Sequence, residues 1–507
     1  GAAGMTLATE SEEVMKRLLP LALYGLLSVL NTSAAHSEMA DGTLGSAAVE
    51  PYLEKLLQNA GCTAEIARER ALNRLQVAAE LEDCVQRQGS EHEAIQRLIS
   101  ELSNELLQLR NHRVNRLDEA VNSLEATAFS PTTRLKGVTT FIIGGNAFAG
   151  TSDTLRNDIR SSFGASIVGY DEKLILRTSF TGKDLLNLRL RAGDLDSDQN
   201  TFGGGGPSQL SELEVAFQQG PFPDRLGVNR AWYQFPVGED WTFTVGSRVN
   251  QSVMLAMWPS VYPDDTVLDL FTQAGASGAY SSNLGAGGGV MWERGPLSFS
   301  LNYIAGNGEN GFSGSGMIGV DAGSSATAQV GWATDTWGIA AALATIQNGF
   351  NIIDYASPFT LRSFNQPGIT TGTALSGYWQ PPDDGWVPSV SAGWGWNSTR
   401  YRKTVKSDGL VSISQSWTVA LQWSDWLFED TSMGLAVGQP IFATALKGGA
   451  TPDDAGFAME GWMMVQVSDA ISVTPALFYL SRPLGADTPQ GTSLSQLGAL
   501  LKTTLRF

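Results

Sequence analysis

The sequence predicts a transmembrane β-barrel of about 16 antiparallel strands, preceded by a short helical and coiled-coil periplasmic region. Three observations carry this prediction. From residue 132 onward, apolar and polar residues alternate with a period of two. Short and long connections alternate between the candidate strands. The chain closes on an amphipathic strand whose last residue is aromatic, Phe507.

The composition agrees with such a barrel. Charged residues make up 17% of the chain, glycines number 56, and the mean hydropathy is −0.07. A barrel gives these averages because lipid-facing apolar residues alternate with lumen-facing polar ones. A net charge of −18 argues against nucleic acid as a partner. All 3 histidines precede residue 113, so we expect no His-based metal site in the barrel, and no cofactor.

Residues 1–37 are predicted to be an upstream segment and a secretory signal peptide. Met15 is the expected start, followed by Lys16 and Arg17, a short apolar run over 18–30, and small residues before residue 38. The run is too short to span a bilayer comfortably. We therefore expect an exported chain.

Residues 38–90 are predicted to be helical and 91–125 to form a coiled-coil stalk. Apolar residues at 95, 99, 102, 106 and 109 are spaced alternately four and three apart, which is heptad spacing. A surface helix packed on its own domain remains the alternative. Cys62 and Cys84 can form one disulfide in an oxidising compartment, or stay as two buried thiols.

The barrel is assigned to 126–507. Seven short connections and eight long ones separate its strands, as sixteen antiparallel strands require when both ends lie on the short-turn side. A soluble β-sandwich or propeller would lack this rhythm. The predicted strands are 132–148, 165–181, 186–193, 227–237, 241–250, 284–293, 296–306, 325–334, 337–348, 370–380, 386–397, 411–424, 431–441, 456–468, 471–482 and 495–507.

Six basic residues alternate with apolar residues on four consecutive strands. A cation that faces the bilayer centre costs about 2–4 kcal/mol, so the basic residues are expected to face the lumen or the protein interior. These pore-lining candidates are Lys173, Arg177, Arg189, Arg191, Arg230 and Arg248.

The third long loop, 251–283, is unusually apolar for an outer loop. Asp264, Asp265 and Asp269 are predicted to begin a short helix whose packing face is Val267, Leu268 and Phe271. We expect this loop to fold into the barrel and narrow it, with the aspartates facing the cations. The alternative is that these acids only cap a surface helix.

Several segments resemble the cyanobacterial outer-membrane porins, which are related to the OprB-type carbohydrate-selective porin family. They are FSPTTRLKG (129–137), TSFTGKDLLNLRLRAGD (178–194), YQFPVGED (233–240), MLAMWPSVYPDDTVLDLFTQAGASGAY (254–280) and the tail LLKTTLRF. The resemblance implies a homotrimer in the outer membrane that passes inorganic ions, iron included, better than large organic solutes. Phe507 resembles the signal read by the barrel assembly machinery.

The N-terminal region departs from that family. LQNAGC (57–62) and ALNRLQVAAELEDCVQR (71–87) resemble two pieces of an S-layer-homology domain, cysteines included. The Gly-Tyr-Pro-Asp-Gly-Thr segment usual between them is missing. Attachment to peptidoglycan-linked polysaccharide is therefore not carried over.

The leading functional expectation is a passive outer-membrane channel for ions and small hydrophilic solutes. No catalytic constellation is found, so we expect no enzyme. The alternatives are a structural linker between outer membrane and cell wall, and a carbohydrate-selective channel. A sugar channel would line its lumen with aromatic platforms, to which Trp394 and Trp396 could contribute, whereas Trp near strand ends more often anchors the membrane interface.

Overall fold

The computed structural model describes residues 132–195, 200–217, 223–383, 385–425 and 430–507, and six single residues between 81 and 102. The chain divides into two units, Gly1–Ala126 and Thr127–Phe507. The predicted signal peptide, Cys62, Cys84 and most of the predicted stalk lie outside the described residues. Within the stalk, Ile95 and Ile99 are helical, but Leu102 lies in a turn where the prediction has a continuous helix.

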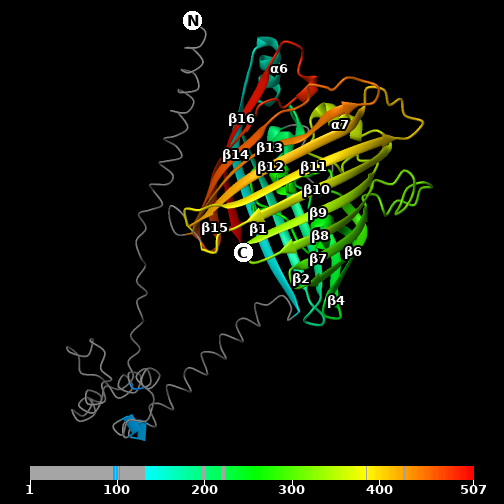
Figure 1. The fold of residues 1–507 in the computed structure, drawn as a ribbon. Coiled ribbons are helices and arrows are strands. Elements are labelled where there is room, and N and C mark those ends of the chain that lie inside the picture. Colours follow the sequence, from blue (N-terminus) through cyan, green and yellow to red (C-terminus); the bar gives the residue numbers. More distant parts are fainter. Residues whose placement is uncertain are drawn as a thin grey trace, which may run out of the picture. The chain divides into compact units, whose positions relative to one another are not determined.

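The second unit is a closed barrel of 16 strands, each hydrogen-bonded to its neighbours in sequence, with β1 closing on β16 (Figure 1). The strands are β1 (Thr133–Gly150), β2 (Ile167–Thr178), β3 (Leu185–Gly193), β4 (Gly227–Val237), β5 (Trp241–Asn250), β6 (Leu284–Arg294), β7 (Leu297–Ala305), β8 (Ser324–Ala333), β9 (Trp337–Gln347), β10 (Gly368–Trp379), β11 (Ser389–Tyr401), β12 (Val411–Ser424), β13 (Thr431–Leu446), β14 (Ala458–Ser468), β15 (Ile471–Leu480) and β16 (Leu494–Arg506).

The predicted number of strands is confirmed, and three predicted ranges match the observed bounds to the residue: 227–237, 241–250 and 411–424. The largest differences concern two strands. β11 runs from 389 to 401 instead of 386 to 397, and β13 continues to Leu446 instead of ending at 441. β13 can pass Pro440 because its pairing with β12 shifts register at bulges beside that residue, and a bulge tolerates a missing N–H donor.

Helices occur only in the connections of the described barrel. α6 (Asp153–Phe163) lies in the first long loop and α7 (Pro358–Phe364) in the fifth. The 3₁₀ turns are η2 (Thr201–Gly203), η3 (Gln209–Ser211), η4 (Gln251–Met254), η5 (Asp269–Gln273) and η6 (Gly485–Asp487). Among the described residues, no helix has both the length and the apolar character needed to cross a bilayer.

Side chains alternate between an inner and an outer face along each strand, as the period of two requires. On β16, alternate residues from Leu494 to Thr504 are buried, and the residues between them are more exposed. The last residue completes the closure, since Phe507 N–H donates to Gly137 O at 3.1 Å and Gly137 N–H donates to Phe507 O at 2.7 Å.

Tryptophans gather on the outer face at the short-turn edge of the barrel. Trp241 begins β5, Trp337 begins β9, Trp379 ends β10, and all three are more than 40% exposed. Amphipathic rings at one edge of a barrel are typical of the girdle at a membrane–water interface. Trp394 and Trp396 also lie on the outer face, because their neighbours Gly395 and Asn397 are the buried ones. The two residues therefore cannot form sugar platforms in the lumen.

Candidate functional site inside the barrel

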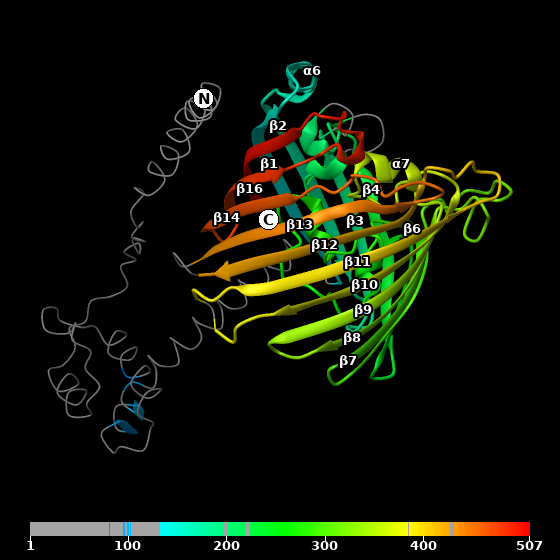
Figure 2. The ribbon, with the colours of Figure 1, turned by 45° about the horizontal axis from the view of Figure 1, so that its top comes forward.

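The third long loop packs on a stripe of small residues on the inner wall, and its segments lie among the strands in Figure 2. A Cβ atom on Gly393 of β11 would lie 1.8 Å from Ala274 O, and one on Gly372 of β10 would lie 2.2 Å from Gly278 O. These glycines leave the space that the loop backbone occupies. The expectation that this loop folds inward therefore agrees with its contacts.

Hydrogen bonds fix the loop to the inner faces of strands far apart around the barrel. Ser376 Oγ of β10 donates to Ala274 O at 2.8 Å, and Ser416 Oγ of β12 donates to Gly275 O at 2.9 Å. On β14, the Glu460 carboxylate accepts from Tyr262 OH and from Leu268 N–H, both at 2.7 Å. The loop thus crosses the interior instead of covering the mouth.

The helix predicted to begin at Asp264 is shorter than expected. Residues 264 and 265 form a turn, 266 and 267 form a bend, Leu268 makes an isolated β-bridge, and the 3₁₀ turn η5 begins at Asp269. Val267, Leu268 and Phe271 are buried, as the predicted packing face requires. Asp265 lies before η5 and is held by a tertiary contact with Arg506, so a regular helix is not needed to place it.

The second long loop, 194–226, also enters the barrel, which the sequence reading missed. Leu213 pairs with Leu268 in an isolated antiparallel bridge, and Glu214 N–H donates to Val267 O at 3.1 Å. Phe202 of the same loop packs edge-on against Phe478 of β15, with ring centroids 6.1 Å apart. Glu212 and Glu214 alternate with Leu213 and Val215, a two-residue period that could have indicated a strand-like segment.

The opposite part of the wall, β1 to β4, carries cations that face one another across strands. The register places Lys173 opposite Arg191, and Arg189 opposite Arg230. At the short-turn end, Arg177 is opposite Arg134 of β1. Like charges directly opposite destabilise a sheet unless an anion lies between them.

One of these pairs has its anion within the chain. The Asp171 carboxylate accepts from Arg191 Nε at 2.6 Å and from Arg191 Nη2 at 3.1 Å, and lies 3.3 Å from Lys173 Nζ. Glu214 of the second loop lies 3.5 Å from the same Nζ. The two carboxylates were not among the predicted site residues. Asp171 lies two residues from Lys173 and hence on the same face, a signal present in the sequence.

The three predicted aspartates lie elsewhere, and none is within ion-pairing distance of the six predicted cations. Asp265 lies 3.5 Å from Arg506 of β16, and Lys502 Nζ donates to the carbonyl of Thr266 at 3.1 Å. Asp269 accepts from Tyr355 OH and from Thr272 Oγ1. Asp264 is exposed within the barrel. The opposition of charge is therefore built chiefly by Asp171 and Glu214.

Carboxylates gather where the second, third and fifth long loops meet. Burial raises the pKa of Glu212 well above its usual range, and the charges of Asp269 and Asp354 add to this rise. Burial, with Asp269 beside it, raises the pKa of Asp354 to about 6. Burial would also raise the pKa of Glu214, but Lys173 and Arg191 outweigh it and hold that pKa below its usual range. The loops therefore lose negative charge between neutral and mildly acidic pH.

Two bulges disturb the predicted alternation of the basic wall. Asn229 is an extra residue beside Arg230, whose Nε donates to Asn250 Oδ1 at 3.1 Å. A second bulge lies between Gly246 and Val249. There Val249 takes the buried inner position, and Arg248 pairs with Ala231 beside a register shift between Ala231 and Trp232. Arg248 lies within this bulge with its Nε buried, so simple alternation does not fix its face, and its place in the lumen stays a prediction.

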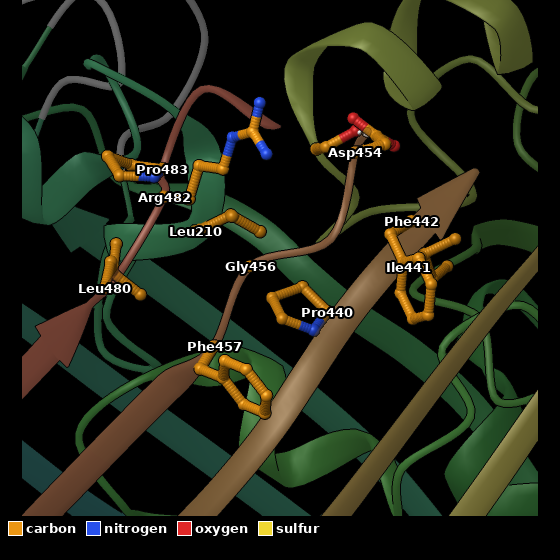
Figure 3. A pocket seen from close by; sticks show the side chains of 11 residues that line it. Leu210, Pro440, Ile441, Phe442, Asp454, Gly456, Phe457, Leu480, Arg482 and Pro483 are labelled. Carbon is orange, nitrogen blue, oxygen red and sulfur yellow. Dashed lines mark hydrogen bonds between the residues drawn. The ribbon is translucent and has the colours of Figure 1, made fainter. Parts of the chain in front are cut away.

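A small pocket at the long-loop ends of β13 to β15 contains Asp454 (Figure 3). Its Oδ2 accepts from Ser357 Oγ, Thr360 Oγ1 and Ala443 N–H at 2.7 Å each, and its Oδ1 accepts from Ala486 N–H at 2.8 Å. With four donors on one carboxylate, Asp454 joins three loops to the rim of the barrel. It is a structural anchor.

Two known proteins are similar in sequence to this chain. The chain is 26% identical to an uncharacterized protein of Nostoc sp. (strain PCC 7120), and the alignment covers 85% of this chain and 79% of that protein. It is 25% identical to an uncharacterized protein of Synechocystis sp. (strain PCC 6803), and the alignment covers 82% of this chain and 79% of that protein. No family model matches the chain.

Solved structures with a similar chain path include OprB of Pseudomonas putida. It has a TM-score of 0.48 and 12% identity, over 74% of this chain and 94% of that one. An anion-selective porin from Comamonas acidovorans has a TM-score of 0.44 and 10% identity, over 74% of this chain and 99% of that one.

Proposed function

We propose that this protein is an outer-membrane porin through which inorganic ions and small hydrophilic solutes diffuse passively. The observation that carries the proposal is the third long loop, held inside a closed barrel by Ser376, Ser416 and Glu460. A loop fixed across the interior narrows the path beside it. The remaining path runs along a wall of cations, with loop carboxylates facing it, which gives a transverse field that small ions tolerate and apolar solutes do not.

The test is single-channel recording of the full chain in planar bilayers, with reversal potentials measured in a KCl gradient. The wild-type chain should form stable channels. Arg189→Ser should shift the reversal potential toward cation preference, and Asp264→Ser should shift it toward anion preference. Both shifts should shrink at molar salt, where the screening length falls to about 3 Å. Unchanged potentials in both variants would place the selective region elsewhere.

Carbohydrate selectivity is the second candidate. It draws support from the resemblance to carbohydrate-selective porins, but the inner-face residues Trp232 and Trp462 and the loop residue Tyr262 are all more than 90% buried in packing with loops or neighbouring strands. A ladder of exposed rings, which sugars would need, is not formed by these residues. Block of KCl current by glucose or maltose in the same bilayers would favour this candidate.

The trimer implied by the sequence resemblance has one supporting feature on the outer face. Glu172 lies midway along β2, opposite outward-facing Thr139, which donates a hydrogen bond to its carboxylate. A carboxylate facing lipid near the bilayer centre is unfavourable, so cover by a neighbouring protomer accounts for it. Native mass spectrometry in mild detergent should give three copies, and a monomer would contradict the proposal.

The remaining partners follow from the same location. The outer face contacts outer-membrane lipid, and the barrel assembly machinery recognises the terminal strand that ends in Phe507. Deleting Phe507 should lower the amount of folded barrel in the membrane without changing the conductance of the channels that do assemble. Binding to peptidoglycan-linked polysaccharide is not part of this proposal.

A further inference from the structure

The cation pairs on the inner wall differ in whether the chain supplies an anion. Asp171 lies between Lys173 and Arg191 and binds the guanidinium through two oxygens. The neighbouring pair, Arg189 opposite Arg230, has no carboxylate within ion-pairing distance among the described residues. The wall therefore contains a neutralised pair and a closely similar pair that is not neutralised.

The hydrogen-bond donors of the second pair are only partly used. Arg230 donates through Nε to Asn250 Oδ1 at 3.1 Å and through Nη1 to Asn229 O at 3.0 Å. Arg189 Nε is buried and donates to no described residue. A buried donor without an acceptor is unfavourable by about 1–3 kcal/mol, and more for a charged group. An acceptor that arrives from the lumen would remove this penalty.

A third arginine, Arg177, is a diagonal cross-strand neighbour of Arg189. Arg177 of β2 is opposite Asn187, two residues from Arg189 on β3, and diagonal neighbours of this kind are within reach of long side chains. Arg177 is exposed and makes no ion pair with a described residue. Arg177, Arg189 and Arg230 thus come from three adjacent strands to one part of the inner face.

We propose that Arg177, Arg189 and Arg230 form a binding station for a tetrahedral inorganic oxyanion, such as phosphate, on its way through the barrel. The oxyanion takes the place at this pair that Asp171 takes at Lys173 and Arg191. Guanidinium groups suit this ligand because their planar N–H forks bind two oxygens at once, whereas chloride offers no second acceptor. The station rests on the proposed channel function and narrows it to a substrate class.

The experiment uses the full chain in planar bilayers at fixed KCl and pH 7.5, with inorganic phosphate added at constant ionic strength. Binding predicts a saturable fall of the chloride current. Arg189→Gln should raise the half-blocking phosphate concentration at least tenfold. Arg400→Gln makes the same charge change on the outward face of β11, opposite exposed Ile369, and should leave it unchanged. A linear, non-saturating effect, or equal block in both variants, would overturn the proposal.

Arg189→Lys distinguishes the contribution of the planar guanidinium group from that of the positive charge alone. It keeps the charge, so the reversal potential in KCl should stay near that of the wild type, while phosphate block should weaken severalfold. Block as strong as in the wild type would show that charge alone suffices and would contradict a built site. Each variant is first checked for a folded barrel by circular dichroism.

Calorimetry of the detergent-solubilised chain with phosphate measures the heat of binding, independently of any channel current. If the chain carries no current in KCl, the channel proposal fails, while heat of binding that Arg189→Gln removes still supports the station. If the chain conducts KCl but shows neither block nor heat with phosphate, the station is wrong and the channel stands.

Discussion

The inner wall of the barrel has two contrasting parts. The part formed by β1 to β4 carries opposed cations, neutralised in one place by Asp171 and Glu214. The part formed by β8 to β12 carries Gly, Ala, Ser and Thr and is covered by the third loop. Small residues allow backbone to lie flat on a sheet, while long charged side chains keep backbone away. The loop therefore lies on the small-residue part, and in the proposed channel the solutes pass beside the charged part.

The strongest way to break this arrangement is to fill the small-residue part. Gly393→Val would place a side chain where Ala274 O now lies, 1.8 Å from the new Cβ, and backbone on both sides cannot yield as a side chain would. We expect the loop to be displaced, with single-channel conductance rising about twofold or more and stability falling by roughly 1–3 kcal/mol. Conductance and thermal unfolding in detergent measure the two effects.

Gly461→Val on β14 is the matched control. Its added Cβ would lie 3.0 Å from the end of the Leu435 side chain, which can move. Its conductance should equal that of the wild type. An unchanged conductance in Gly393→Val as well would mean that the loop does not limit the path.

The next change removes the anion from the charged part. Asp171→Asn leaves Arg191 and Lys173 facing each other with only Glu214 nearby. Breaking a buried ion pair by removing one partner typically costs about 3–5 kcal/mol, so the melting temperature should fall and anion preference should rise. Asp153→Asn, on exposed α6, removes an i,i+3 ion pair with Arg156 and should change neither property measurably. Equal melting temperatures for the two variants would show that Asp171 does not neutralise this wall.

The smallest expected effect comes from pH, through the loop carboxylates. Burial raises the pKa of Asp354 to about 6, above its ordinary value near 4. The folded chain then holds this proton more tightly than the unfolded chain, so its contribution to stability is full below about pH 4 and is lost as the pH rises through about 6.

Lowering the pH from 7.5 to 5 should therefore make the loops less negative and raise the anion-to-cation permeability ratio modestly. Asp354→Asn should show a high ratio already at pH 7.5 and a flatter pH profile. Reversal potentials across this range measure the change. A profile in the variant as steep as in the wild type would assign the titration to other groups, such as Glu212.

The candidate site was only partly readable from the sequence. Lys173, Arg177, Arg189 and Arg191 lie on the expected face because β2 and β3 alternate regularly. Arg230 lies opposite Arg189 although a bulge at Asn229 is next to it. The rule does not decide the face of Arg248, since a bulge adds one residue between Gly246 and Val249, and no local signal marked it. The partners of the cations were also misassigned, because proximity in sequence suggested the third-loop aspartates.

The sequence by itself determined the strand number, most strand ends and the two faces, since these depend on local alternation and on the free energy of placing charge in lipid. Tertiary structure alone decided which loop residues meet which wall. Barrel closure brings Leu213 beside Leu268. It also brings Tyr262 beside Glu460, which lies nearly 200 residues further along the chain. Such contacts depend on the curvature of the whole sheet and on the space left by glycines such as Gly372 and Gly393, and neither is a local property of the chain.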